Sequence, residues 1–247
     1  MKIFGIIPAR YDSSRFPGKP LVMIQGIPMI QRVYTRALQC KSLAGLVVAT
    51  DDDRIMQCVQ SFGGNVCMTS LHHRSGTERC NEATGFFQSL SPEDVIVNIQ
   101  GDEPFIDPRQ LDQLVACFDD ENVQIGTLIK KIESENELFD PNVVKVIRDK
   151  NSKAICFSRQ TLPYFRGKDP DSWLAGGSFY KHVGLYGYSA GVLKELVALP
   201  ESALEKAESL EQLRWLENGY AIHVRETELA SVAIDSPSDL LKITNSI

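Results

Sequence analysis

Three short apolar runs, each followed by a polar segment, constrain the fold of this chain most strongly. They span residues 3–7, 46–49 and 95–99. Runs of this length are typical of strands buried on both faces of a parallel sheet, although a buried helical segment gives the same pattern. The chain is therefore expected to bury a sheet between layers of other structure.

Apolar residues at helical spacing separate these runs. The periodicity covers residues 30–38 and 55–62, and Gly63 and Gly64 end the second segment. A short strand is expected at residues 66–68. Alternation of this kind predicts a three-layer α/β fold with a mostly parallel sheet.

Strand periodicity returns between Val143 and Phe157, with a turn at residues 149–151. It predicts an antiparallel hairpin that leaves the parallel core and offers a lid or a dimer surface. No repeat, low-complexity tract or linker divides the 247 residues. We therefore expect residues 1–247 to form a single domain.

Charge and composition restrict the partners. The net charge of -6 provides no basic field for long nucleic acid, so any phosphate chemistry has to rest on a few local cations. The six cysteines lack the spacing of a zinc site and are expected to be reduced thiols. Neither a signal-peptide pattern nor a run of about 18 apolar residues is present, which predicts a soluble, cytoplasmic protein without membrane insertion.

The first apolar run leads into residues 8–21, which we call the entrance loop. Arg10, Arg15 and Lys19 can pair with phosphate oxygens, and Gly18 lets the backbone come close to a ligand. Solvated loop charges are the plain alternative. The position after a strand favours ligand binding, because open α/β sheets bind ligands at the carboxyl ends of their strands. Walker A and G-x-G-x-x-G patterns are absent, so a nucleoside triphosphate outside the P-loop and dinucleotide-binding classes is the expected ligand.

Two aspartates are candidate metal ligands. Asp102 follows the third apolar run, and Asp235 precedes a helix that Ser236 caps and Pro237 begins. Carboxylates placed in this way can share Mg²⁺ with triphosphate oxygens. Asp235 alone is equally well explained as a turn or capping residue.

Two further segments offer polar groups. Ser75 stands at an expected helix start, where capping and phosphate binding are both open. Glu208, Glu211 and Gln212 have i, i+3, i+4 spacing on one expected helix that ends at Gly219, so they would project from one face. Such a face suits a hydroxyl-rich substrate, although an ordinary helix surface would look the same.

Taken in order, these motifs resemble the 3-deoxy-manno-octulosonate cytidylyltransferase family from residue 6 to residue 240. The entrance loop is also similar to that of sialic-acid cytidylyltransferases. The narrower similarity lies in residues 48–51, 67–79, 98–104, 182–188 and 210–214. The resemblance implies a Rossmann-like nucleotidyltransferase fold. It also implies an enzyme that joins CTP to 3-deoxy-D-manno-octulosonate (Kdo), giving CMP-Kdo and pyrophosphate for lipopolysaccharide biosynthesis.

The resemblance implies the site residues as well. The expected nucleotide-binding residues are Ala9, Arg10, Arg15, Lys19, Ser75 and Gln100. The expected catalytic residues are Arg15, Lys19, Asp102 and Asp235, and the two aspartates would hold Mg²⁺. The expected sugar-binding residues are Arg159, His182, Tyr186, Glu211 and Gln212. A homodimer is also implied.

Alternative substrates and functions remain open. Gln160 and residues 170–179 depart from the family pattern, and some members of the family use an 8-amino form of the sugar. A sialic-acid cytidylyltransferase or a sugar 1-phosphate transferase is the nearest other enzyme, against which the segments around His182 and Glu211 argue. A non-catalytic nucleotide-binding regulator would keep the entrance loop but would not need two distal aspartates.

Overall fold

The structure of the protein is a computed structural model and describes residues 1–12, 16–230, 233–234 and 236–244. The chain divides into two compact units. Unit 1 consists of Met1–Asp112, Gly187–Val197 and Ala230–Ile247, and unit 2 consists of Gln113–Tyr186 and Ala198–Leu229. The single domain over residues 1–247 stays a prediction.

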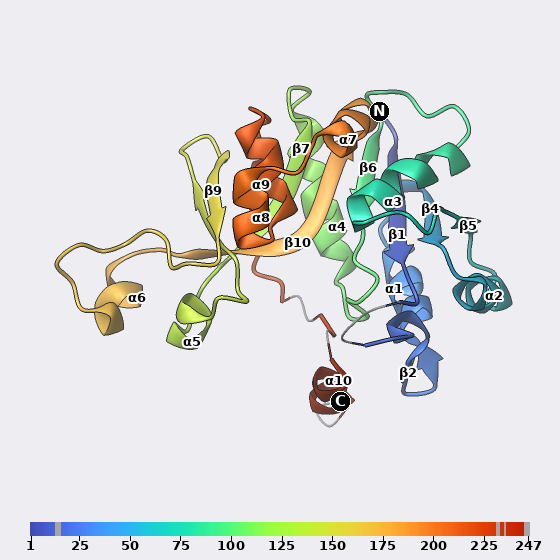
Figure 1. Ribbon diagram of the computed structural model, residues 1–247, viewed down its shortest axis with the longest axis horizontal. Coiled ribbons are helices and arrows are strands. Elements are labelled where there is room, and N and C mark those ends of the chain that lie inside the picture. The colour runs from blue at the N-terminus through green and yellow to red at the C-terminus, as the bar shows by residue number, and fades with distance from the viewer. Residues whose placement is uncertain (13–15, 231–232, 235, 245–247) are drawn as a thin grey trace. The chain divides into compact units, whose positions relative to one another are not determined.

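Unit 1 is built on a parallel sheet (Figure 1). Strand β1 (Ile3–Ala9) lies between β6 (Val95–Asn98) and β4 (Leu43–Thr50), and β5 (Val66–Met68) follows β4. The chain therefore steps from β1 to one side to form β4 and β5, and to the other side to form β6. This arrangement makes β1 the point at which the strand order reverses.

The register of β1 brings the carboxyl ends of three strands to one edge. Ile6 lies opposite Asn98 of β6, and Ala9 lies opposite Thr50 of β4. Residues 3–7 are all buried, so both faces of β1 are covered. The three-layer arrangement expected from the apolar runs is confirmed for this strand.

Helices cover the sheet of unit 1. Helix α3 (Gly76–Ala83) contacts β1, β4 and β6, and Figure 1 shows it crossing in front of β1. Helix α1 (Met29–Ala37) contacts β1 and β4, and α2 (Asp53–Ser61) contacts β4 and β5. The other elements that begin in this unit are η1 (Lys19–Leu21), β2 (Met23–Ile24), β3 (Ile27–Pro28), η2 (Thr84–Phe86), α4 (Pro108–Val115), α7 (Ala190–Ala198) and α10 (Pro237–Thr244).

Unit 2 combines parallel and antiparallel pairing. Strand β7 (Ile125–Lys131) is parallel to β11 (His223–Glu226) and neighbours β10 (Tyr180–Ser189), whose last three residues belong to unit 1. Strands β8 (Lys145–Arg148) and β9 (Ala154–Ser158) form the antiparallel hairpin. The remaining elements are η3 (Ala116–Asp119), α5 (Glu135–Phe139), η4 (Pro170–Ser172), α6 (Trp173–Gly176), α8 (Ala203–Glu208) and α9 (Glu211–Glu217). Within the described ranges, no helix has the length and apolarity to cross a membrane.

The predicted α/β class, the mostly parallel pairing and the hairpin are confirmed. One helix prediction was wrong. Glu208 ends α8, whereas Glu211 begins α9, so the acidic residues do not share one helix face. The helical conformation is interrupted at Ser209, which adopts a left-handed conformation with φ 51°. The capping box of Ser202 and Glu205 gives α8 its own start.

Gly101, just after β6, allows the tightest backbone approach in this region. A Cβ atom at this position would lie 2.9 Å from the carbonyl oxygen of Pro8 in β1. We predict that Gly101→Ala lowers the free energy of unfolding by about 1–3 kcal/mol, because backbone has to move. Urea unfolding measures this change.

Gly85→Ala is the matched control. A Cβ atom there meets nothing within 4 Å, and its φ is not in the left-handed region. We expect this substitution to change the free energy of unfolding by less than about 0.5 kcal/mol. Equal effects of the two substitutions would contradict the close approach of Gly101 to β1.

Candidate active site

The candidate site of unit 1 is a cavity of about 260 Å³ at the carboxyl ends of β1 and β6. It lies where the strand order reverses, which is the usual ligand position in open α/β sheets. Six predicted nucleotide or metal residues line it: Ala9, Arg10, Lys19, Ser75, Gln100 and Asp102. The structure therefore brings these residues together, and their individual roles stay predictions. Arg15 and Asp235 lie outside the described residues.

Lys19 and Asp102 form an ion pair in the cavity wall. The Lys19 Nζ donates to Asp102 Oδ2 at a distance of 2.7 Å, and both side chains are partly exposed, at 15% and 26%. Opposite charges attract more strongly at such a site than in open water. The backbone N–H of Ile234 also donates to the Asp102 carbonyl oxygen over 2.9 Å. Ile234 is thereby attached beside Asp102.

Ser75 has the capping role that its position suggested. Its hydroxyl accepts a hydrogen bond from the Glu78 backbone N–H over 3.2 Å and so caps α3. The next residue, Gly76, packs closely, since a Cβ atom there would lie 3.3 Å from Pro8 Cγ. The start of α3 thus adjoins the end of β1, and its backbone amides add partial positive charge to the cavity wall.

Arg79 is a buried cation of the cavity wall. The sequence placed it in the segment after Ser75 but did not predict a role for it. It is 3% exposed. Its Nη2 donates to Asp51 Oδ2 over 2.6 Å, and its Nη1 donates to Thr69 Oγ1 over 2.5 Å. The two partners follow β4 and β5, so only the parallel pairing of these strands brings them to α3.

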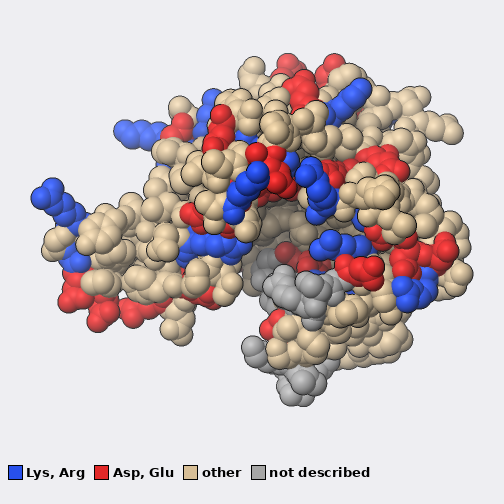
Figure 2. Space-filling model, viewed as in Figure 1, with Lys and Arg blue, Asp and Glu red and all other residues tan. Residues whose placement is uncertain are grey.

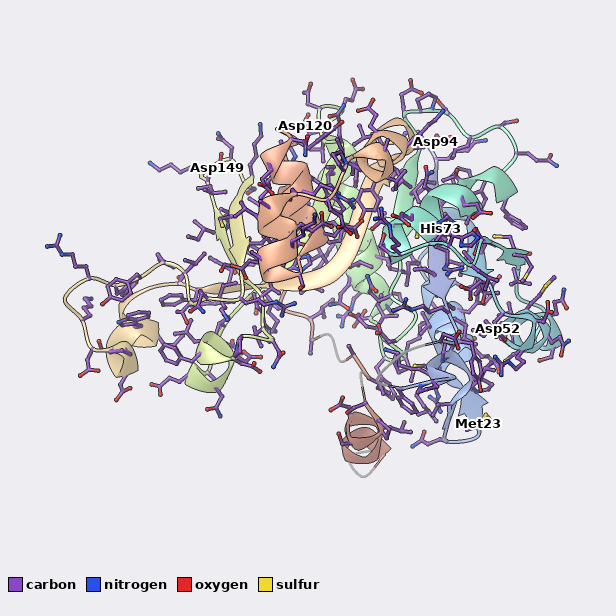
Figure 3. All side chains as sticks on the ribbon, viewed as in Figure 1. Met23, Asp52, His73, Asp94, Asp120 and Asp149 are labelled. Atoms are coloured by element: carbon purple, nitrogen blue, oxygen red, sulfur yellow. The ribbon has the colours of Figure 1, made fainter. Side chains whose placement is uncertain are left out.

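His73 and Arg74 also line the cavity and were not predicted as site residues. Figure 3 labels His73 beside α3. Its Nε2 contacts Glu82 Oε2, and Arg74 Nη2 lies 3.0 Å from Glu78 Oε1. Acidic side chains therefore accompany the cations here, and Figure 2 shows both signs interspersed over the visible face.

Unit 2 holds the residues predicted to bind the sugar acid. The His182 ring Nε2 is 3.0 Å from Thr127 Oγ1, and the His182 and Tyr186 ring centroids are 5.1 Å apart. Tyr186 also packs edge-on against Trp215 of α9, with centroids 5.2 Å apart. Burial lowers the pKa of His182 to about 4, so its ring is neutral at pH 7.

The predicted residues of α9 are held firmly. Glu211 Oε1 accepts from Arg214 Nη2 over 2.8 Å, and Gln212 is 5% exposed. Burial raises the pKa of Tyr186, and the charge of Glu211 raises it further. Both effects keep the Tyr186 hydroxyl protonated at pH 7.

Arg159 follows β9 and is fixed by main-chain oxygens. Its Nε donates to the Glu208 carbonyl over 2.6 Å, and its Nη1 donates to the Pro141 carbonyl over 3.1 Å. The Glu208 carboxylate accepts from the Arg159 backbone N–H over 2.8 Å. Glu208, expected on the substrate face of a helix, is instead a support for Arg159.

Known proteins are similar to this chain over nearly its whole length. The Cytidylyltransferase family profile matches residues 4–226. A 3-deoxy-manno-octulosonate cytidylyltransferase of Parabacteroides distasonis is 56% identical, with 98% of this chain and 96% of that protein covered. A protein of the same name from Bacteroides thetaiotaomicron is 51% identical, with coverages of 97% and 96%.

Solved structures agree with this similarity. A CMP:2-keto-3-deoxy-manno-octonic acid synthetase complexed with CTP superposes with a TM-score of 0.91 at 42% identity, covering 100% of this chain and 98% of that one. A thymidylyltransferase structure from Bacillus anthracis has a TM-score of 0.65 at 20% identity, over 99% and 94% of the two chains. The second likeness shows the fold alone.

The lowered pKa of His182 predicts a pH dependence of stability. Unfolded histidine binds a proton below its ordinary pKa of 6.5, whereas folded His182 does so only below about 4. The free energy of unfolding should therefore fall as pH decreases from 6.5 to 4, by about 1.4 kcal/mol per pH unit within this interval. His182→Gln should lose less stability over the same interval. Chemical denaturation at several pH values measures the difference, and parallel pH profiles would contradict the burial of a neutral imidazole.

Proposed function

The chain belongs to the Cytidylyltransferase family, and from this premise we propose that it joins CTP to Kdo, releasing pyrophosphate and forming CMP-Kdo. The product would serve lipopolysaccharide biosynthesis. The observation that carries the proposal is the cavity at the ends of β1 and β6, which gathers Lys19, Ser75, Gln100 and Asp102. The similar structure at 42% identity is complexed with CTP.

Different cavity residues would bind different parts of a nucleoside triphosphate. Arg10 and Lys19 supply positive charge for phosphate oxygens, and Gln100 offers an amide that both donates and accepts hydrogen bonds. The start of α3 behind Ser75 adds backbone N–H groups and a favourable dipole end for an anion. We assign the cytosine nucleotide to Ser75 and Gln100, and the triphosphate to Arg10, Arg15 and Lys19.

The donor set of the cavity fits Mg²⁺. Asp102 provides a hard carboxylate oxygen next to the cations that would hold the phosphates. Mg²⁺ in nucleotide sites commonly uses one or two carboxylates together with substrate phosphate oxygens and water. We propose Asp102 and Asp235 as these carboxylates, which the attachment of Ile234 to Asp102 supports. Bound there, Mg²⁺ would neutralise charge on the phosphates.

The proposed reaction is a direct displacement. The anomeric 2-hydroxyl of Kdo attacks the α-phosphorus of CTP and releases its proton to solvent. The bond between the α-phosphorus and the oxygen that it shares with the β-phosphate breaks, and pyrophosphate leaves with that oxygen. Lys19 and the arginines stabilise the charge that builds on pyrophosphate. In unit 2, Arg159 supplies a cation for the sugar carboxylate, while neutral His182 with Tyr186, Glu211 and Gln212 offers hydrogen bonds to hydroxyl groups.

Three finer points belong to the same proposal. The ordinary sugar is preferred to its 8-amino form, the protein acts in the cytoplasm, and it forms a homodimer through the region of the β8–β9 hairpin. Exposed Ile155 on β9 is compatible with such a contact, since it is 60% exposed in the single chain. Gel filtration with light scattering tests the dimer, and a monomer at micromolar concentration would contradict it.

Pyrophosphate release tests the reaction itself. We expect release with CTP and Kdo in the presence of Mg²⁺, and little release when CTP is replaced by UTP, ATP or GTP. Kdo should be compared with 8-amino-Kdo, sialic acid and hexose 1-phosphates. Turnover of another sugar would change the substrate, whereas CTP binding without release from any pair would favour a non-catalytic nucleotide-binding regulator.

Asp102→Asn tests the metal assignment. The substitution keeps the volume of the side chain but removes the charge that would bind Mg²⁺, so we expect kcat to fall on the order of 100-fold. The free energy of unfolding should change by less than about 1 kcal/mol, because the lost ion pair is partly exposed. Asp112→Asn is the control, since that carboxylate accepts from Cys40 and Ser42 outside the cavity. Equal turnover of the two variants at saturating Mg²⁺ would contradict the assignment.

A further inference from the structure

Tyr11 of the entrance loop carries a cation on its ring. The guanidinium carbon of Arg54 lies 3.2 Å from the ring centroid. At this distance the positive charge is attracted by the negative face of the ring, and the flat guanidinium can stack on it. The contact joins the entrance loop to α2, two segments that the sequence gives no reason to connect.

Arg54 is also bound by Asp52. Its Nε donates to Asp52 Oδ1 over 2.9 Å, and its Nη2 donates to Asp52 Oδ2 over 2.6 Å. Asp52 also caps α2 by accepting from the Arg54 backbone N–H over 2.9 Å. Figure 3 labels Asp52 near the start of this helix. The Arg54 side chain is 56% exposed, and its guanidinium is oriented by a two-bond pair on a capped helix as well as by the Tyr11 ring.

The Tyr11 ring also packs against Gly18. A Cβ atom on Gly18 would lie 3.1 Å from two carbons of this ring, and Gly18 has φ 70°, a conformation that favours glycine. The backbone N–H of Gly18 donates to the Tyr11 carbonyl oxygen over 2.9 Å. The two ends of the segment 11–18 are therefore held together at Tyr11, beside Arg54.

Lys19 follows Gly18 directly and begins η1. Its Nζ reaches Asp102 Oδ2 over 2.7 Å in the cavity. A loosened contact between Tyr11 and Gly18 would shift the residue before Lys19 and widen the range of positions that its Nζ samples. Residues 8–10 and residues 19–20 line the cavity, so segment 11–18 lies between two cavity-lining stretches in the sequence.

We propose that Tyr11 and Arg54 form a positioning clip that holds Gly18, and with it Lys19, in the arrangement that receives the triphosphate of CTP. The inference rests on the proposed function for its ligand. Neither residue lines the cavity among the described residues, so each acts through the loop. The clip reduces the number of loop conformations that nucleotide binding has to exclude.

The chain contains a matched control for this contact. At the start of α4, Arg109 makes the same pair with Asp107, with Nε to Oδ1 at 3.0 Å and Nη2 to Oδ2 at 2.6 Å. The Arg109 backbone N–H also donates to Asp107 Oδ1 over 2.9 Å. Among the described residues, the cations found over rings are Arg54, Arg148 and Lys168, so Arg109 has the pair without the ring.

Steady-state kinetics with CTP as the varied substrate test the clip. Arg54→Ala should raise KM for CTP by about two- to fivefold, the factor that a cation–ring contact of this exposure supports, with kcat changed less than twofold. Tyr11→Leu should have the same effect, and Tyr11→Phe, which keeps the ring, should restore a KM near that of the native chain. Arg109→Ala should leave KM unchanged, because it removes an equivalent pair elsewhere.

Limited trypsin digestion gives a second readout that does not depend on activity. The bond after Arg15 is the tryptic site within segment 11–18, and Lys19 is followed by Pro20, which blocks cleavage. Arg54→Ala should be cut after Arg15 faster than Arg109→Ala by a similar factor. An equal rate of cleavage in these two variants, or an equal KM for CTP, would overturn the clip. If the native chain releases no pyrophosphate, the proposed function fails, and the difference in cleavage alone decides whether Tyr11 and Arg54 hold the loop.

Discussion

The parallel pairing of β1 with β6 is the constraint on which the candidate site depends. Ile6 opposite Asn98 sets the register, so the chain leaves both strands at the same edge of the sheet. The entrance loop begins at that edge beside Gln100 and Asp102. If the pairing of β1 with β6 shifted by one residue, the buried side chains of β1 would turn to the opposite faces of the sheet. The packing of the core of unit 1 therefore fixes which residues of the two strands reach the cavity.

Positive charges in both units are positioned by protein groups. Lys19 is paired with Asp102, Arg79 with Asp51, and Arg159 with the carbonyl oxygens of Glu208 and Pro141. Side chains restrained in this way lose little further freedom when they meet a phosphate or carboxylate. Catalysis by charge stabilisation needs such preorganisation, because groups that have to reorient during reaction contribute less.

Local patterns in the sequence were sufficient for several strands and for part of the site, but they did not predict β7 or β10. The buried strands β1, β4 and β6 followed from uninterrupted apolar runs, and the β8–β9 hairpin followed from strand periodicity about a turn. The break between α8 and α9 could not be predicted, because Ser209 adopts its left-handed conformation without a glycine to indicate it. The partners of Arg79 and the contact of Arg54 with Tyr11 join separate strands and loops, and no local pattern encodes such contacts.

A crystal structure of this protein with CTP and Mn²⁺, whose anomalous scattering locates the metal, is the most direct test of the proposed site. We expect the nucleotide in the cavity at the carboxyl ends of β1 and β6, with its phosphates near Arg10 and Lys19 and Mn²⁺ on Asp102. A nucleotide bound outside this cavity, or a metal bound away from Asp102, would contradict the proposed site.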